Sequence, residues 1–124
     1  MYPHILFALT LALLAAEVPA MECARAGNFA EKAICSDPVL TRLDTALNQN
    51  YRWMLDADIG KGARDALKHS QRIWVIQRNR CSDRECLMTL YKQRIEDICD
   101  YPVIGGVHPV CDEPDVSAGI PHPD

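Results

Sequence analysis

The residues of this chain that could do covalent chemistry are six cysteines, and their number and spacing favour disulfide bonds over catalysis. An even number of cysteines in a short chain with an export segment is typical of a disulfide framework. Sequence order favours local pairing, which would join Cys23 to Cys35, Cys81 to Cys86, and Cys99 to Cys111. By loop entropy, a bridge across twelve residues would stabilise the fold by about 3 kcal/mol.

A second group of residues combines polar and aromatic side chains on one predicted helix face. Steps of four, three, four and three along the chain place them in a single stripe: Leu67, Gln71, Trp74, Arg78 and Cys81. A buried amide or guanidinium needs hydrogen-bond partners, because an unsatisfied polar group costs about 1–3 kcal/mol. The stripe therefore predicts a polar network inside a helical core.

Two arginines, Arg78 and Arg94, are predicted to face this core, and a buried guanidinium needs a carboxylate. We expect Asp44 or Glu31 to pair with one of them and Gln71 to complete the network. A structural role is favoured over the alternative, a catalytic site of paired carboxylates. The expected network comprises Glu31, Asp44, Gln71, Trp74, Arg78, Tyr91 and Arg94.

Motifs for catalysis or for cofactor binding are missing from the sequence. It contains no C-x-x-C, no G-x-S-x-G and no phosphate-binding G-x-x-x-x-G-K-[ST] pattern. The histidines lack metal-ligand spacing, and a weak site at His108 and His122 is less favoured than a solvated tail. Basic residues alternate with acids along the helices, which argues against nucleic-acid binding. We expect no catalytic residues, no cofactor and no metal.

Helical periodicity predicts a short helix before Cys35 and three longer helices, over residues 38–56, 63–80 and 83–99. Asn28 is suited to cap the short helix, and Asp37 followed by Pro38 is a strong start for the next. From Asp100 the periodicity ends and prolines become frequent. The predicted fold is an all-α, disulfide-bonded helical bundle of three main helices plus a short N-terminal helix, with an irregular C-terminal tail.

The boundaries of the later helices follow from local residues. Gly60 and Gly62 are predicted to separate the second helix from the third. Ser82 and Glu85 have capping-box spacing, which predicts that Ser82 caps the fourth helix.

Three large apolar side chains lie beside the main stripes. Ile73 and Ile76 add apolar surface to the third helix, which predicts that this helix is covered on two sides. Trp53 lies next to the apolar face of the second helix. We expect it in the core or at its boundary, in preference to a partner-binding role.

The first twenty residues are predicted to be a signal peptide. A nearly unbroken apolar run of a dozen residues, Ile5 to Ala16, is too short to span a bilayer, and Ala20 supplies the small residue for cleavage. A membrane anchor is the less favoured alternative. Because Cys23 does not follow a lipobox-like triplet, we expect a periplasmic or secreted protein that is not a lipoprotein and has no membrane contact when mature. The expected parts are residues 1–20, a helical domain over 21–99, and a proline-rich acidic tail over 100–124.

Charge is distributed unevenly along the chain. The net charge is −4, and all thirteen Lys and Arg residues lie between Arg25 and Arg94, whereas the segment from Glu96 to Asp124 carries seven acids and no base. Such a tail could attract a cationic partner or fold back on the basic body of its own chain. The second interpretation is favoured.

The order and spacing of these residues resemble a known family. The run EKAICSDPVLxxLD from Glu31 to Asp44, then QxxWxxxRxxC from Gln71 to Cys81, and YxxRI from Tyr91, are similar to the LprI-type lysozyme-inhibitor domain. The resemblance covers nearly all of residues 23–98. It implies a small, exported bacterial protein with a helical, disulfide-bonded fold. Cys99, Cys111 and the tail lie outside it.

The resemblance implies binding to a protein target, lysozyme or another peptidoglycan hydrolase, by covering its catalytic cleft. Acidic tail residues would help to capture a basic enzyme: Asp112, Glu113 and Asp115. An immunity protein against a rival bacterium's effector is a variant of this function. A periplasmic structural or accessory module without an enzyme target is the alternative.

Overall fold

The structure is a computed structural model that describes residues 21–116 of the chain. Over this range the chain forms no strand and five helical segments: η1 (Cys23–Arg25), α1 (Phe29–Ser36), α2 (Pro38–Asp56), α3 (Lys61–Asn79) and α4 (Arg84–Cys99). The predicted all-α bundle of three long helices and a short one is confirmed. The predicted signal peptide lies outside the described range, as do residues 117–124.

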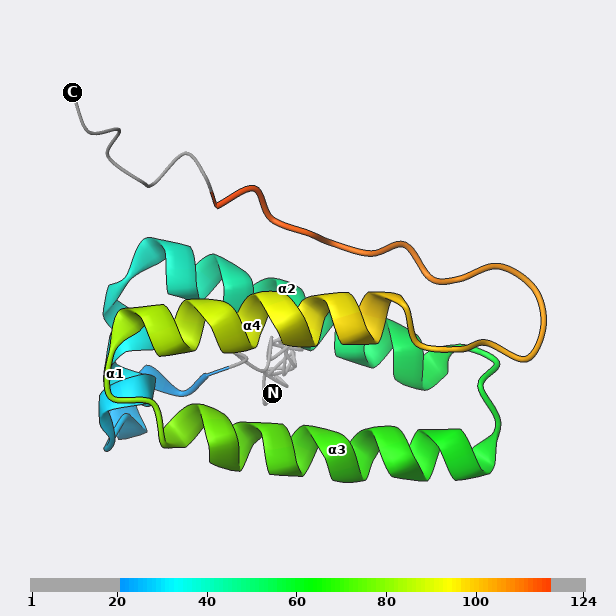
Figure 1. Cartoon of the computed structure of the whole chain (residues 1–124), viewed down its shortest axis with the longest axis horizontal. Coiled ribbons are helices and arrows are strands. Elements are labelled where there is room, and N and C mark those ends of the chain that lie inside the picture. The colour runs from blue at the N-terminus through cyan, green and yellow to red at the C-terminus, as the bar shows by residue number, and fades with distance from the viewer. Residues whose placement is uncertain (1–20, 117–124) are drawn as a thin grey trace, which may run out of the picture.

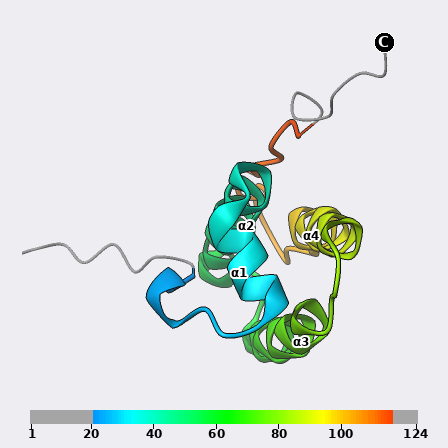
Figure 2. The same ribbon diagram turned by 90° about the vertical axis from the view of Figure 1, so that its left-hand side faces the viewer.

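The three long helices lie side by side, and α3 runs antiparallel to α2 and α4 (Figure 1). Seen along their axes they form a triangle, and α1 lies across one end of it (Figure 2). The most extensive contact is between α2 and α4, while α1 packs on α2 and α3. None of the helices between residues 21 and 116 is long and apolar enough to cross a membrane.

Side-chain caps start the first two α-helices where the sequence predicts them. The Asn28 side chain accepts a hydrogen bond from the backbone N–H of Glu31. Asp37 accepts from the backbone N–H groups of Val39 and Leu40, and Pro38 occupies the first helical position. These caps satisfy backbone donors that have no partner within a helix.

The predicted cap of α4 is wrong by one residue. Asp83, rather than Ser82, is the N-cap, and its carboxylate accepts a 2.8 Å hydrogen bond from the backbone N–H of Cys86. Serine and aspartate cap equally well, so spacing alone does not choose between adjacent candidates.

One of the two glycines predicted to separate α2 from α3 belongs to α3 itself. Gly62 lies in the first turn of that helix, whereas Gly60 precedes it with a φ of 83°. A Cβ atom on Gly60 would lie 2.9 Å from the Cδ1 atom of Ile104. Glycine is therefore needed at position 60 both for the backbone angle and for the close approach of Ile104.

The core is an apolar layer between α2 and α4, closed by α1 and α3. Its largest fully buried side chains come from all four helices: Ile34, Leu40, Leu43, Leu47, Leu67, Leu87, Tyr91 and Ile98. These positions recur at helical spacing, so each helix contributes one face.

The prediction that α3 is covered on two sides is wrong. Ile73 and Ile76 are 43% and 54% exposed, because α3 occupies a corner of the triangle and buries only the face that carries Leu67, Trp74 and Arg78. Trp53, expected in the core or at its boundary, is instead one of the exposed large apolar side chains, with 37% of its surface accessible.

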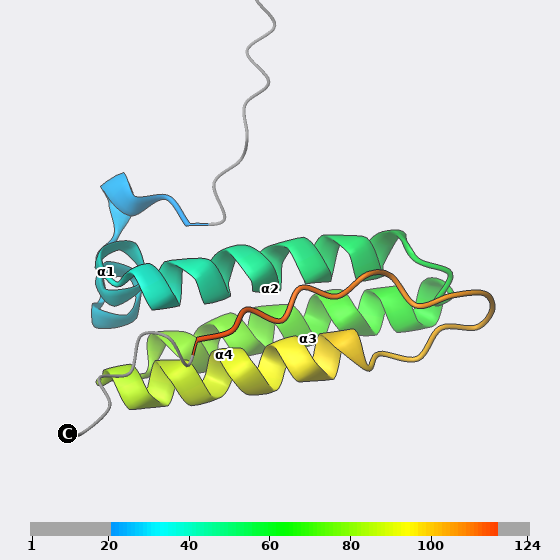
Figure 3. The same ribbon diagram turned by 90° about the horizontal axis from the view of Figure 1, so that it is seen from above.

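After α4 the chain is irregular, forms a loop beyond the end of the bundle and returns along α2 (Figures 1 and 3). The Asn50 side chain, buried on α2, donates to the carbonyl of Asp112 and accepts from its N–H at 2.7 and 2.8 Å. Val116 is buried farther along. The described part of the tail is thus fastened to the body by more than the expected Cys111 bridge, and it folds back as the favoured interpretation predicts.

Candidate functional site

Three disulfides fix the ends of the helices. They join Cys23 to Cys35, Cys81 to Cys86, and Cys99 to Cys111, which is the local pairing favoured by sequence order. The first ties η1 to α1, the second closes the turn between α3 and α4, and the third ties the end of α4 to the tail. Crosslinks between such segments limit how far the helices and the tail can separate.

A buried carboxylate joins α2 to α4. Asp44, on α2, accepts a 2.7 Å hydrogen bond from the hydroxyl of Tyr91, on α4. The Nη1 atom of Arg78, on α3, lies 3.9 Å from the same Asp44 oxygen, and both side chains are more than nine-tenths buried. Of the two carboxylates expected to pair with an arginine, the structure therefore places Asp44 beside Arg78.

The guanidinium of Arg78 has further partners. Its Nε and Nη2 atoms donate to the side-chain oxygen of Asn79 at 3.1 and 2.9 Å, and its Cζ atom lies 5.8 Å from the ring centre of Trp74. Trp74 packs edge-to-face on Tyr91, with 5.0 Å between ring centroids, and its indole N–H donates to the carbonyl of Leu90. Among the described residues, no fully buried side-chain nitrogen or oxygen lacks a hydrogen-bond partner, as a stable buried network requires.

Burial controls the ionisation of the cluster. It raises the pKa of the Asp44 carboxyl, and this rise is opposed by the hydrogen bond from Tyr91 and by the charge of Arg78. Burial, with the negative charge of Asp44, also raises the pKa of Tyr91 far above its usual value. The phenol therefore remains protonated and serves as a hydrogen-bond donor.

The remaining residues of the expected network form separate contacts. Gln71 accepts a 3.0 Å hydrogen bond from Nε of Arg94, whose Nη2 donates to the hydroxyl of Ser70. Arg94 is only half-buried at the α3–α4 seam and has no carboxylate partner within hydrogen-bond distance among residues 21–116. Glu31, the other candidate partner for an arginine, instead bonds to the Asn28 side chain at the start of α1.

The described residues hold a single group of three potential metal ligands, Cys99, Cys111 and Glu113. The two sulfur atoms of this group are bonded to each other. A disulfide sulfur is a poor zinc ligand, because zinc binds the thiolate. His69 and His108 are exposed and belong to no such group within residues 21–116.

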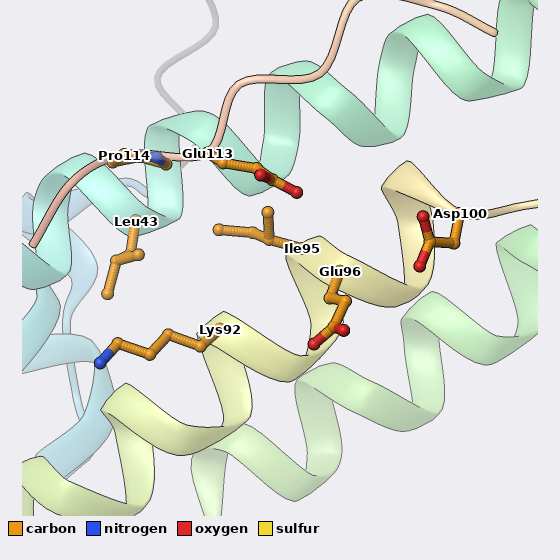
Figure 4. A pocket seen from close by; sticks show the side chains of 7 residues that line it. All are labelled: Leu43, Lys92, Ile95, Glu96, Asp100, Glu113 and Pro114. Atoms are coloured by element: carbon orange, nitrogen blue, oxygen red, sulfur yellow. The ribbon is translucent and has the colours of Figure 1, made fainter.

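The tail and α4 border an acidic hollow of about 470 Å³. Glu113 from the tail, Glu96 from α4 and Asp100, the residue after α4, line this hollow with Ile95, and Lys92 is the one base in the lining (Figure 4). Asp112, which is exposed, precedes Glu113 on the tail, and Asp115 follows two residues after it. The tail thus brings Glu113 next to Glu96 and Asp100, a proximity that the order of the acids along the chain does not predict.

Two long-range contacts have no signal in the sequence. Asn50, which anchors the tail, lies on α2 among apolar positions that give no indication of a partner 62 residues away. Arg84, at the start of α4, donates a 2.6 Å hydrogen bond to the Asp37 cap of α2, and this pair lowers the pKa of Asp37. One aspartate thus starts α2 and holds the start of α4.

These features define a helical scaffold, crosslinked by three disulfides, in which the buried polar groups serve the fold and the tail forms an acidic outer surface. The family model of the lysozyme inhibitor LprI matches residues 21–98. The chain therefore belongs to the LprI lysozyme-inhibitor family. No curated protein and no solved structure matches the chain. The matched range ends just before Cys99, so the loop and the tail are outside it.

Proposed function

We infer that the protein inhibits a lysozyme or a related peptidoglycan hydrolase by binding over its catalytic cleft. The observation that carries this proposal is the family match over residues 21–98. In such hydrolases two carboxylates flank the glycosidic bond, so a protein that covers the cleft stops the reaction without chemistry of its own. The protein would act as a binding partner in the periplasm or outside the cell, where disulfides persist.

The disulfide-bonded helical scaffold presents a preformed binding surface. Disulfides fix both ends of the bundle, and the Asp44 cluster joins its three long helices. A preformed surface loses little conformational entropy on association, which favours tight binding.

The acidic hollow supports recognition of a basic enzyme. Glu96, Asp100 and Glu113 surround it, and Asp112 and Asp115 lie on the same tail segment. A concentration of like charge speeds association with an oppositely charged partner and makes the rate depend on salt. Lysozyme, a strongly basic protein, has the required charge.

The first test is a lysozyme activity assay with the purified, oxidised protein. Inhibition at a stoichiometry of one to one is expected, and it should be lost after reduction of the disulfides. If lysozyme remains fully active while a pull-down recovers another peptidoglycan hydrolase, the target is that enzyme, and the immunity variant holds if the enzyme is a rival bacterium's effector. If neither enzyme class is bound or inhibited, the proposal is wrong and the accessory-module alternative remains.

The role of the hollow is tested with charge-neutral variants. Glu96→Gln/Glu113→Gln removes two carboxylates from it, and Glu22→Gln/Glu85→Gln removes two exposed carboxylates that do not line it. The first variant should associate with lysozyme about tenfold more slowly at low salt, and its rate should depend less on salt. The second should behave like the unmodified protein. Equal effects of the two variants would remove the hollow from the mechanism.

A further inference from the structure

A second hollow, of about 580 Å³, lies between the end of α2 and the loop that follows α4. It is lined by one indole, by small and branched apolar side chains, and by two carboxylates: Trp53, Asp56, Ala57, Asp58, Gly105, Val107, Pro109 and Val110. We name it the Trp53 hollow. It lies beside the loop that projects past the end of the bundle in Figures 1 and 3.

The loop wall of this hollow is held in place. The Cys99–Cys111 disulfide closes the loop, and the N–H of Ile104 donates a 2.8 Å hydrogen bond to the carbonyl of Asp58. Asn50 fixes the chain immediately after the disulfide. The Trp53 hollow therefore exists before any partner binds.

The Trp53 hollow exposes large apolar side chains to solvent. Val107 and Val110 are 90% and 80% exposed, and the Trp53 indole beside them is also partly exposed. Clustered exposed apolar side chains of this kind mark interaction sites. Tryptophan is also one of the residue types that contribute most to binding energy at interfaces.

The two carboxylates determine which partner fits. Within residues 21–116, neither Asp56 nor Asp58 has a side-chain hydrogen bond or ion pair. A hollow lined by an indole and two carboxylates suits a cation with an apolar stem, because an aromatic ring attracts the charge and the acids accept its hydrogen bonds. A guanidinium stacks on the ring and bonds a carboxylate in a planar fork, whereas an ammonium is a strongly hydrated point charge.

We propose that the Trp53 hollow binds an arginine side chain on the surface of a basic protein. This inference rests on the proposed function, and the protein that presents the arginine is the cationic hydrolase. The chain itself carries a net charge of −4, so a second copy is the less suitable occupant. With this contact, the target would be bound at two places along the tail: at the Trp53 hollow beside the loop, and at the acidic hollow beside Glu113.

Direct binding of arginine is tested with a hexa-arginine peptide, followed by the two indole N–H signals in nitrogen-proton NMR spectra. The signal of Trp53 should move on titration, whereas that of Trp74, whose N–H bonds to Leu90, should not. Hexalysine, which has the same charge, should bind about fivefold more weakly. Asp56→Asn/Asp58→Asn should weaken hexa-arginine binding by a similar factor, and Glu22→Gln/Glu85→Gln should leave it unchanged.

Binding to lysozyme is measured in parallel with Trp53→Ala, and Ile76→Ala on α3 is the control for loss of an exposed apolar side chain. Trp53→Ala should weaken binding about tenfold, and Ile76→Ala should not. If the unmodified protein binds lysozyme but Trp53→Ala does so equally well, this inference is overturned and the proposed function stands. If lysozyme is not bound, the proposed function fails for that enzyme and the peptide titration decides alone: an unmoved Trp53 signal overturns the inference, and a moved one supports it.

Discussion

The hydroxyl of Tyr91 donates a 2.7 Å hydrogen bond to the carboxylate of Asp44, and both side chains are buried between α2 and α4. Tyr91→Phe removes this donor from a buried acceptor, so we expect the free energy of unfolding to fall by about 1.5–3 kcal/mol. Tyr51→Phe is the control, because within residues 21–116 the Tyr51 hydroxyl makes no hydrogen bond. Urea unfolding of both variants measures the difference, and equal losses would contradict it.

Arg78 balances the charge of Asp44, although their 3.9 Å separation is long for an ion pair. Arg78→Met leaves the buried carboxylate without a cation, and we expect a loss of about 3 kcal/mol, the lower end for such a change. The exposed Arg72→Met should change stability by less than about 0.5 kcal/mol. A double-mutant cycle with Asp44→Asn measures the coupling, and a coupling of zero would show that the two groups act independently.

The raised pKa of Asp44 predicts a pH-dependent contribution to stability. Because the folded-state pKa lies above the ordinary value of 3.8, this contribution is fully present below that pH and is lost as the pH rises through the folded-state pKa. The free energy of unfolding of Asp44→Asn, relative to the unmodified protein, should therefore increase between about pH 3 and about pH 7. Asp65→Asn should show the opposite trend, since Lys61 lowers the pKa of Asp65. Denaturant unfolding across this pH range measures both variants. If the two stability differences changed in the same direction with pH, the predicted rise in the pKa of Asp44 would be contradicted.

Asp37 has two roles that substitution can separate. Asp37→Ala removes the cap of α2 and the contact with Arg84, and the cap alone is expected to contribute about 1 kcal/mol. Asp37→Asn retains a capping oxygen and removes only the charge, so it should cost less. Thermal unfolding distinguishes the two variants, and equal losses would assign the whole effect to the ion pair.

Two disulfides of equal span allow stability and function to be separated. Cys23–Cys35 and Cys99–Cys111 both join residues twelve positions apart, so replacing either pair with serine should cost about 3 kcal/mol. Only Cys99→Ser/Cys111→Ser removes the bridge that closes the loop, and only this variant should inhibit lysozyme less well at a temperature at which both remain folded. Equal inhibition by both variants would exclude the loop from the contact.

The sequence was sufficient to predict the helices, because apolar periodicity and the pair Asp37 and Pro38 act locally. It was also sufficient to predict the cysteine pairing, since each bridge joins neighbouring cysteines. Periodicity predicts that Asp44 or Glu31 pairs with an arginine, but it does not decide which of the two carboxylates does so. It indicates which face of each helix points inward, but not how far one helix is shifted along its axis relative to another.

The exposed surface was harder to predict. Whether Ile73 and Ile76 are covered depends on the position of α3 at a corner of the triangle, which no property of α3 alone determines. The path of the tail depends on Asn50, a single polar residue on α2. Both hollows arise where this path crosses the helices, so neither follows from local sequence.

The residues at the two ends of the projecting loop, Cys99 and Cys111, have Cα atoms only 5.7 Å apart. A segment that leaves and re-enters a domain at neighbouring points can be lengthened, shortened or exchanged while the helices keep their course. The part of the loop beyond the Ile104–Asp58 hydrogen bond, residues 105–110, is therefore a position for grafting foreign peptides. Libraries displayed there should yield binders of new specificity that retain the melting temperature of the parent domain.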